Sequence, residues 1–244
     1  MREPLDTIKV MTFNIHHGKG TDKKLELNRI KDVIYSSGAD IIGLNEVDKN
    51  FSKRSNYVDQ IELLANELHY FYAFSPSLSK KSRKTEYEYH QYGNALLSRY
   101  PLKHSQNHLL NYLPRVIEGR SVLEAAIEVN EKILNVFVTH LSLNPITHWL
   151  QSSFILNKLE APAIILGDWN MKPYSRNWKR VTKNFEDVWE EKGSGLGNTY
   201  PSTKPRMRLD YIFISHDLKT VDVKVIDQIP FASDHLPLVA TLSI

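Results

Sequence analysis

The sequence predicts an α/β fold built as one large domain over residues 1–244. A chain of 244 residues suits one α/β or two-sheet domain better than two small ones. Its 41% hydrophobic and 24% charged residues are typical of a globular protein. The chain begins with an expected strand at 8–13, a helix within 22–37 and a strand at 40–44, the order of a βαβ unit. No repeat, low-complexity tract or linker divides the chain.

The elements of the first half follow from apolar periodicity. Residues 8–13 are an apolar run that ends at Asn14, and 22–37 carries apolar residues near helical spacing before a stop at Gly38. The further elements expected are an amphipathic helix at 57–68, a strand at 70–74, a loop at 75–84, an alternating segment at 86–92 and a strand at 95–97.

The second half is expected to be richer in strands. Segment 104–118 reads as irregular or as an edge strand, because Pro114 interrupts it. Segments 120–129 and 133–139 alternate and form a hairpin. The other elements expected are a helix at 145–159, a buried strand at 163–166, a weaker helical segment at 178–189, a loop at 193–205 and strands at 209–214, 219–226 and 236–244.

The composition excludes several kinds of site and several classes of protein. The absence of cysteine excludes disulfides, thiolate zinc sites and a cysteine nucleophile. A net charge of +3 and a pI near 8.8 permit a polyanionic partner without requiring one. No apolar run is long enough for a transmembrane segment. Arg2, Glu3 and Asp6 stand where a signal peptide needs its apolar core, so we expect a cytoplasmic protein.

Polar side chains recur at or beside the ends of the expected strands. Asp168 and Asn170 follow the buried strand 163–166, and their spacing places both on one side if the chain stays extended. The other residues of this kind are Asn14, Glu46, His140, Asp210, Asp234 and His235. Oxygen ligands without thiols favour Mg²⁺ or Mn²⁺, and the whole set suits attack of water on a phosphoester. The sequence has no Walker loop, GxGxxG or GxSxG motif.

Each of these residues also has a purely structural interpretation. Asp168, Asn170 and Asn14 can cap helices or form turns. Glu46 can be a solvated side chain, and His140 a histidine at the edge of the core. Asp234 and His235 can form a turn before the last strand. Asp210, inside an apolar strand, is costly unless it is paired, which favours a functional or buried-pair role.

Seven short motifs together resemble the endonuclease/exonuclease/phosphatase superfamily, which includes DNase I-like nucleases. They are FN (13–14), NEV (45–47), GNALLSRYPL (93–102), TH (139–140), GDWN (167–170), LDYIF (209–213) and SDH (233–235). Each is weak alone, but they follow the family's order over residues 8–244. The resemblance implies a four-layer α-β-β-α sandwich of two packed mixed β-sheets. One departure is Asn45, where many members have Gln.

The resemblance also implies a role for each site residue. Glu46 would be the main ligand of a divalent metal, with Asn14 beside it and Asp234 completing the metal environment. Asp168 would position or deprotonate the attacking water, and Asn170 would hold the phosphate. His235 would contact the phosphoryl group, oriented by Asp210. His140 would donate to a non-bridging or leaving oxygen.

Weaker candidates surround this set. Arg54 and Arg120 are possible phosphate clamps, because a guanidinium matches phosphate oxygens. Asn94, in the third motif, is a further candidate for substrate binding. His16 and His17 could approach the substrate or lie in an exposed loop. The basic run Lys80–Lys84, with nearby tyrosines, could grip a polyanion, although such runs are usually solvated loops.

We therefore expect a Mg²⁺- or Mn²⁺-dependent phosphohydrolase that cleaves a phosphodiester by in-line attack of water, either nuclease-like or a general phosphodiesterase. The partner would be a phosphoester substrate, with a nucleic acid as one candidate. One alternative is a hydrolase of phospholipid head groups or inositol phosphates, and another is a non-catalytic binding module. A nuclease should show a basic groove, and a lipid enzyme should show apolar loops around its site. The sequence predicts no oligomeric state.

Overall fold

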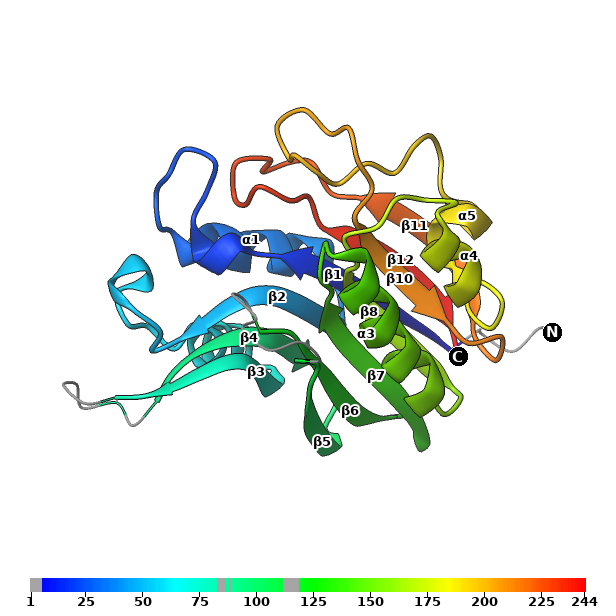
Figure 1. The fold of residues 1–244 in the computed structure, drawn as a ribbon, viewed down its shortest axis with the longest axis horizontal. Helices are drawn as coiled ribbons and strands as arrows, with labels where there is room; N and C mark the ends of the chain where they lie inside the picture. The colour runs from blue at the N-terminus through cyan, green and yellow to red at the C-terminus, as the bar shows by residue number, and fades with distance from the viewer. Residues whose placement is uncertain (1–5, 83–86, 88, 112–118) are drawn as a thin grey trace.

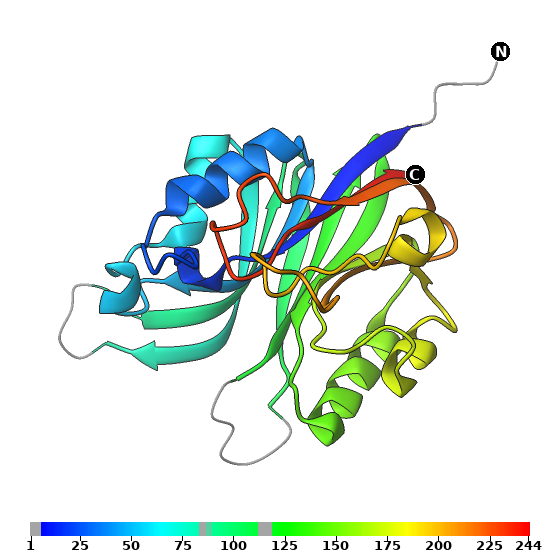
Figure 2. The same cartoon turned by 90° about the horizontal axis from the view of Figure 1, so that it is seen from above.

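Two β-sheets packed face to face form the centre of the molecule. The computed structural model describes residues 6–82, 87, 89–111 and 119–244. Both sheets are mixed, because each has a parallel pair among antiparallel strands. Helices lie on the outer face of each sheet, which gives four layers (Figures 1 and 2). The α-β-β-α sandwich expected from the resemblance is confirmed.

The first sheet has the strand order β11-β12-β1-β2-β4-β3. Its strands are β1 (Thr7–Asn14), β2 (Ile41–Lys49), β3 (Phe71–Lys81), β4 (Tyr89–Ser98), β11 (Lys219–Val225) and β12 (Leu238–Ser243). Helices α1 (Leu27–Ser37) and α2 (Gln60–Leu68) cover its outer face. Ile34 of α1 and Leu64 of α2 belong to one buried cluster with Met11 and Ile42 of the sheet. Gly38, at a φ of 65°, ends α1 as expected.

The second sheet has the strand order β5-β6-β7-β8-β10-β9. Its strands are β5 (Leu102–Leu109), β6 (Ser121–Val129), β7 (Lys132–His140), β8 (Ala163–Asp168), β9 (Glu186–Asp187) and β10 (Asp210–Ile214). Helices α3 (Pro145–Lys158) and α4 (Arg176–Val181) cover its outer face, while α5 (Val188–Lys192) lies near β10 and β11. The 3-10 turns η1 (His16–Gly18) and η2 (Lys53–Ser55) complete the described elements.

The main core lies between the two sheets. Val10 and Ile41 of the first sheet share one buried cluster with Val136, Leu166 and Ile212 of the second. These residues come from the central strands, whose neighbours on both sides exclude water. The same central strands carry the polar residues at their ends, so the core fixes the positions from which the site is built.

Two predicted elements differ in the structure. The loop expected at 75–84 is wrong up to Lys81. Strand β3 continues to that residue and pairs with β4, where Lys80 lies opposite His90. Pro76 is tolerated because β3 is an edge strand with a bulge between Pro76 and Leu78. Residues 83–86 of the expected loop and 112–118 of the expected edge segment lie outside the described residues.

The single helical segment expected at 178–189 is also wrong. The chain forms α4, then β9, then α5. Asp187 interrupts helical structure because it pairs with Phe213 of β10, while its side chain accepts a hydrogen bond from the Trp189 N–H and caps α5. The helix expected at 57–68 begins later, at Gln60, where Asp59 caps it. No helix in the described part of the chain has both the length and the apolar character needed to cross a membrane.

Candidate active site

Asp168, the last residue of β8, lies where the polar ends of several strands meet. Its register partners are His140 at the end of β7 and Asp210 at the start of β10. The first sheet reaches the same point, because β1 ends at Asn14, whose Nδ2 donates to Asp168 Oδ2 at 3.2 Å. The ends of both sheets therefore place these four side chains together, as the sequence predicted.

Glu46 is presented by a bulge in β2. The register between β2 and β4 shifts between Leu44 and Val47, and Glu46 has a φ of 60°. A residue with a β-carbon rarely adopts this left-handed backbone conformation unless the surrounding structure stabilises it. Asn14 Nδ2 donates to Glu46 Oε1 at 3.1 Å, so one amide group joins Glu46 to Asp168. The bulge thus aims a carboxylate that a regular strand would send elsewhere.

His235 comes from the loop that precedes β12. Its Nδ1 donates to Asp210 Oδ2 at 2.8 Å, and its Nε2 lies 3.7 Å from Asp168 Oδ2. The Ser233 hydroxyl donates to the Asn14 carbonyl at 2.7 Å and ties this loop to the end of β1. The expected carboxylate–imidazole pair of Asp210 and His235 is therefore present. The ring of Tyr200, which the sequence reasoning missed, lies 4.8 Å from the His235 ring between centroids.

Asn170 is held by two acceptors. Its Nδ2 donates to the Leu141 carbonyl at 3.0 Å and to His140 Nε2 at 3.1 Å. Its backbone N–H donates to Asp168 Oδ1 at 3.0 Å. We expected His140 to donate to a non-bridging or leaving oxygen, but in this arrangement its Nε2 accepts a hydrogen bond from Asn170. The structure thus joins His140, Asn170 and Asp168 in one connected set.

Asn45 is a supporting residue whose importance only the structure reveals. Its side-chain oxygen accepts from the Asp168 N–H at 2.9 Å, and its Nδ2 donates to Asn94 Oδ1 at 2.8 Å. Asn94 in turn donates to the Ser121 carbonyl at 2.8 Å. These buried amides hold the backbone N–H of Asp168 in place through a chain of hydrogen bonds. The sequence showed Asn45 only as a departure from the family pattern.

Burial and neighbouring charges raise the pKa values of Asp168 and His235 and lower that of His140. Burial raises the pKa of Asp168 to about 7, although the nearby His235 acts against that rise. Burial by itself lowers the pKa of His235, but the carboxylates of Asp210 and Asp168 outweigh it and raise the pKa to about 10. Burial, together with Arg120 and His235, holds the pKa of His140 well below its usual value. At neutral pH the site therefore holds a charged His235 and a neutral His140.

A cavity of about 470 Å³ opens onto these groups. The predicted site residues that line it are Glu46, Arg120, His140, Asp168, Asn170, Asp234 and His235. Asn14 and Asp210 lie behind the lining and are bonded to it. The structure does not place Arg54 or Asn94 in this lining: Arg54 binds Asp48 at 2.6 Å, and Asn94 is buried against Asn45 and Ser121. Lys80 and Lys81 end β3 and also lie outside the lining.

The donor groups beside Glu46 fit a divalent cation. Ligand atoms of Glu46, His16 and His17 lie within 4.8 Å of one another, and His16 Nδ1 lies 3.9 Å from Asp234 Oδ1. Carboxylate oxygens at the mouth of a cavity, with no thiolate in the chain, suit Mg²⁺ or Mn²⁺, and the imidazoles add affinity for Mn²⁺. Asn14 contributes by orienting Glu46, since its own oxygen accepts the His16 N–H.

Comparisons with known proteins identify a family and proteins of the same fold. The model of the Endonuclease/Exonuclease/phosphatase family matches residues 11–235. The protein YbhP of Escherichia coli (strain K12) is 26% identical over 260 residues, which cover 97% of this chain and 96% of that protein. An endonuclease/exonuclease/phosphatase from Beutenbergia cavernae has a similar structure, with a TM-score of 0.82, 24% identity and coverage of 98% of this chain and 72% of that one.

A mannosyl-6-phosphatase from Bacteroides thetaiotaomicron also has a similar structure. Its TM-score is 0.76 at 16% identity, with coverage of 97% of this chain and 100% of that one. At this identity the likeness concerns the fold.

Proposed function

The chain belongs to the endonuclease/exonuclease/phosphatase family, and we propose that it is a divalent-metal-dependent phosphodiesterase that uses an activated water molecule as its nucleophile. The family is one of phosphoesterases, which supports hydrolysis of a phosphoester. The observation that carries the proposal is the position of Asp168. This buried carboxylate lies beside His140, Asn170 and His235 in the lining of one cavity, and it accepts a hydrogen bond from Asn14 behind that lining.

In the proposed mechanism, Asp168 orients the attacking water and accepts its proton. A general base works best with a pKa near the working pH, and burial raises that of Asp168 to about 7. Its Oδ1 is fixed by the Asn170 N–H at 3.0 Å, so the carboxylate has one preferred orientation. This fixed orientation would align the water with the phosphorus atom.

His235 would stabilise the charge that develops on the phosphoryl oxygens. Asp210 keeps the imidazole charged and holds its Nδ1, which leaves Nε2 directed toward the cavity. Arg120 also lines the cavity and is proposed as a second phosphate contact. The amide of Asn170 would bind the phosphate by exchanging one of its two Nδ2 hydrogen bonds, to His140 Nε2 or to the Leu141 carbonyl, for a phosphate oxygen, while the other keeps the amide in position.

The metal ion would be held by Glu46 and Asp234, with the imidazoles of His16 and His17 beside them and Asn14 orienting Glu46. When bound, a divalent cation supplies a Lewis acid that offsets charge on the phosphate. The surrounding protein then has the tasks already described: orienting the substrate, holding the water and keeping His235 charged.

Hydrolysis of bis(p-nitrophenyl) phosphate and p-nitrophenyl phosphate tests this proposal. We expect turnover of the diester with Mg²⁺ or Mn²⁺, loss of turnover with EDTA, and loss of turnover in Asp168→Asn. A matched control is Asp217→Asn, which changes an acid outside the cavity. Hydrolysis of the monoester alone, or hydrolysis unaffected by EDTA, would contradict the proposal. Abasic and intact DNA, RNA, inositol phosphates and sphingomyelin complete the panel.

A further inference from the structure

A second and larger cavity adjoins the catalytic one. Its volume is about 710 Å³, within the range of small-molecule binding sites. Leu143, Asn170, Met171 and Lys172 line both cavities, so the two cavities are adjacent and meet at these residues. A molecule whose phosphate is bound next to Asn170 would therefore have space for one of its substituents in the second cavity.

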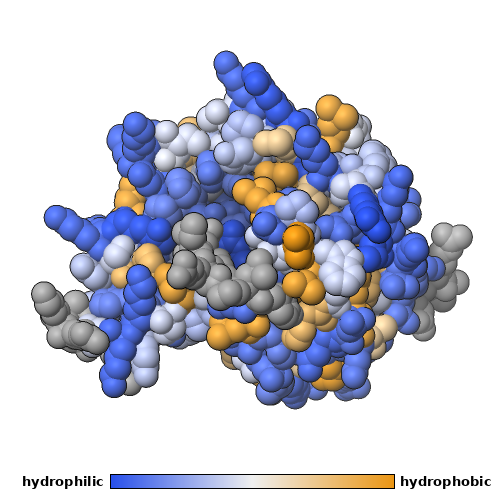
Figure 3. Space-filling model, in the orientation of Figure 1, coloured by the Kyte–Doolittle hydropathy of each residue, from blue (hydrophilic) through white to orange (hydrophobic). Residues whose placement is uncertain are grey.

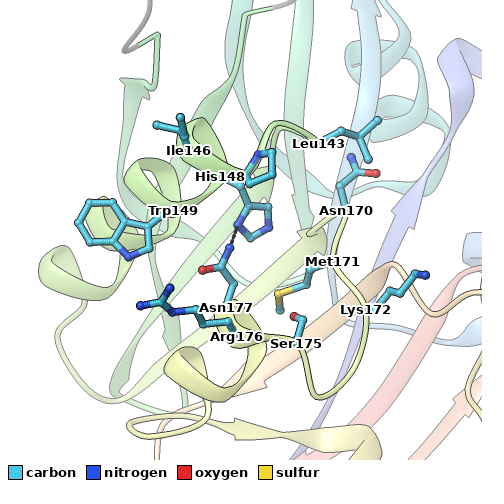
Figure 4. Close-up of a pocket in the computed structure, with 11 residues that line it drawn as sticks. Leu143, Ile146, His148, Trp149, Asn170, Met171, Lys172, Ser175, Arg176 and Asn177 are labelled. Carbon is cyan, nitrogen blue, oxygen red and sulfur yellow. Dashed lines mark hydrogen bonds between the residues drawn. The ribbon is translucent and has the colours of Figure 1, made fainter.

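Two segments that are distant in the sequence form the walls of this second cavity. The loop after β7 and the first turns of α3 give Leu143, Ile146 and Trp149, the segment after β8 gives Met171, and the start of α4 gives Arg176 (Figure 4). In Figure 4, Trp149 and Ile146 lie on one side and Asn170 and Leu143 lie on the other, with His148 between them and Met171 below Asn170. One side of the cavity thus leads directly to the predicted phosphate ligand Asn170.

The walls are mainly apolar and are unusually exposed. The exposed fraction is 77% for Leu143, 67% for Ile146 and 51% for Trp149. These three residues are spaced three apart, and such grouped apolar side chains beside a cavity mark a binding surface. Figure 3 shows hydrophobic side chains among hydrophilic ones on the face that contains these loops. Contact with an apolar ligand would remove this surface from water.

The main polar groups in the walls are already paired with protein atoms. His148 Nε2 donates to the Trp169 carbonyl at 2.7 Å, and its Nδ1 accepts from Asn177 Nδ2 at 2.8 Å. Ser175 caps α4 by accepting from the Trp178 N–H. These groups are therefore committed to the protein rather than to the edge of a nucleobase. An alkyl chain needs no such hydrogen bonds and matches the aliphatic walls.

Two exposed cations, Lys172 and Arg176, lie at the edge of the same cavity. Among the residues that the structure describes, neither has an acidic partner. Apolar walls with unpaired cations beside them suit an amphiphile, in which an anionic group is attached to an alkyl chain. The cations at the edge and the apolar walls therefore match the two parts of an amphiphile, its anionic group and its alkyl chain.

We propose that the second cavity binds an alkyl chain of the substrate, an inference that rests on the proposed function. The preferred substrate is then an amphiphilic phosphoester. The phosphate lies in the catalytic cavity beside Asn170, and the chain extends past Leu143 toward Ile146 and Trp149. Ile146 and Trp149 then determine specificity and have no part in the chemistry.

The first experiment compares ethyl, butyl and octyl p-nitrophenyl phosphodiesters below their aggregation concentrations. We expect kcat/KM to rise by about tenfold or more from butyl to octyl, because four further methylenes become at least partly buried. In Ile146→Glu, the added carboxylate should reduce this rise to about twofold or less while the ethyl ester is cleaved normally. Tyr35→Glu, a change at a residue of α1 that is also largely exposed, should keep the full rise.

The second experiment measures binding without turnover. Calorimetry with octylphosphonate and methylphosphonate should give a tighter Kd for the octyl compound by about tenfold or more, and Ile146→Glu should remove the difference. This result would support the cavity even if no diester were cleaved, in which case only the proposed function fails. Cleavage of all three esters at equal kcat/KM, equal Kd values, or tighter and Ile146-dependent binding of adenosine monophosphate would overturn the proposal.

Discussion

The imidazole of His235 donates from Nδ1 to Asp210 Oδ2 over 2.8 Å, while its Nε2 lies 3.7 Å from Asp168. One side chain therefore connects a fully buried carboxylate to the carboxylate that we propose as the base. Asp210 fixes both the orientation and the charge of the ring, which explains why an acid is tolerated at the start of an otherwise apolar strand.

Replacing Asp210 by Asn should lower kcat by about 10²- to 10⁴-fold with a smaller change in KM. The pKa of His235 is lowered by burial and raised by Asp210, so without that charge the pKa falls. The imidazolium is then lost at a lower pH, and the alkaline limb of the kcat–pH profile should move toward lower pH. Profiles of both proteins over the same range measure this shift. An unchanged alkaline limb would show that His235 does not govern it.

Replacing His235 by Ala should lower turnover by about 10³-fold, because a positioned charge at the phosphoryl group is lost. The affinity of the His235→Ala variant for Mn²⁺ should stay nearly unchanged, since His235 is hydrogen-bonded to Asp210 rather than to the proposed metal ligands. Calorimetric titration with Mn²⁺ measures the affinity independently of turnover. A large loss of Mn²⁺ affinity would instead make the imidazole a metal ligand.

Replacing Glu46 by Gln should abolish metal-dependent turnover and weaken Mn²⁺ binding by about 10²-fold or more, because a neutral amide is a poor substitute for a carboxylate ligand. The protein should still fold, since the bulge and the Asn14 contact accommodate an amide of the same size. Glu131→Gln, an exposed change at the β6–β7 turn, is the matched control. Turnover at the wild-type rate in Mg²⁺ would make the metal assignment wrong.

His148 should make stability depend on pH. Burial lowers its pKa in the folded state, whereas the unfolded value is about 6.5. Above pH 6.5 both states hold a neutral ring and the full contribution to stability is present. As the pH falls from 6.5 toward the lower folded pKa, the unfolded chain takes up the proton first, so the free energy of unfolding decreases.

The test compares His148→Gln with the wild type in urea at pH 7.5 and 5.5. The wild type should lose more stability between these pH values than the variant, because the variant lacks this proton linkage. The difference isolates His148 from His17 and His140, whose pKa values are also lowered. Equal losses in the two proteins would contradict the assignment.

The sequence determined the residue types at the strand ends and the class of fold. Apolar runs such as 163–166 are buried on both faces, so local pattern and burial agree there. The acids, amides and imidazoles at or beside the ends of these runs were identifiable because loops at strand ends are where sites are usually assembled on a sheet. The positions of Asn14, Asp168, Asp210 and His235 could therefore be anticipated before their contacts were known.

The tertiary structure alone decided what depends on pairing between distant segments. The extension of β3 to Lys81 results from its partner β4, and the orientation of Glu46 from a bulge that no local pattern announces. Asn45 supports Asp168 across 123 residues, and the walls of the second cavity come from two segments, 143–149 and 170–177, that meet only in the folded chain. Periodicity reports burial along one segment, whereas register, bulges and cavities arise only when segments meet.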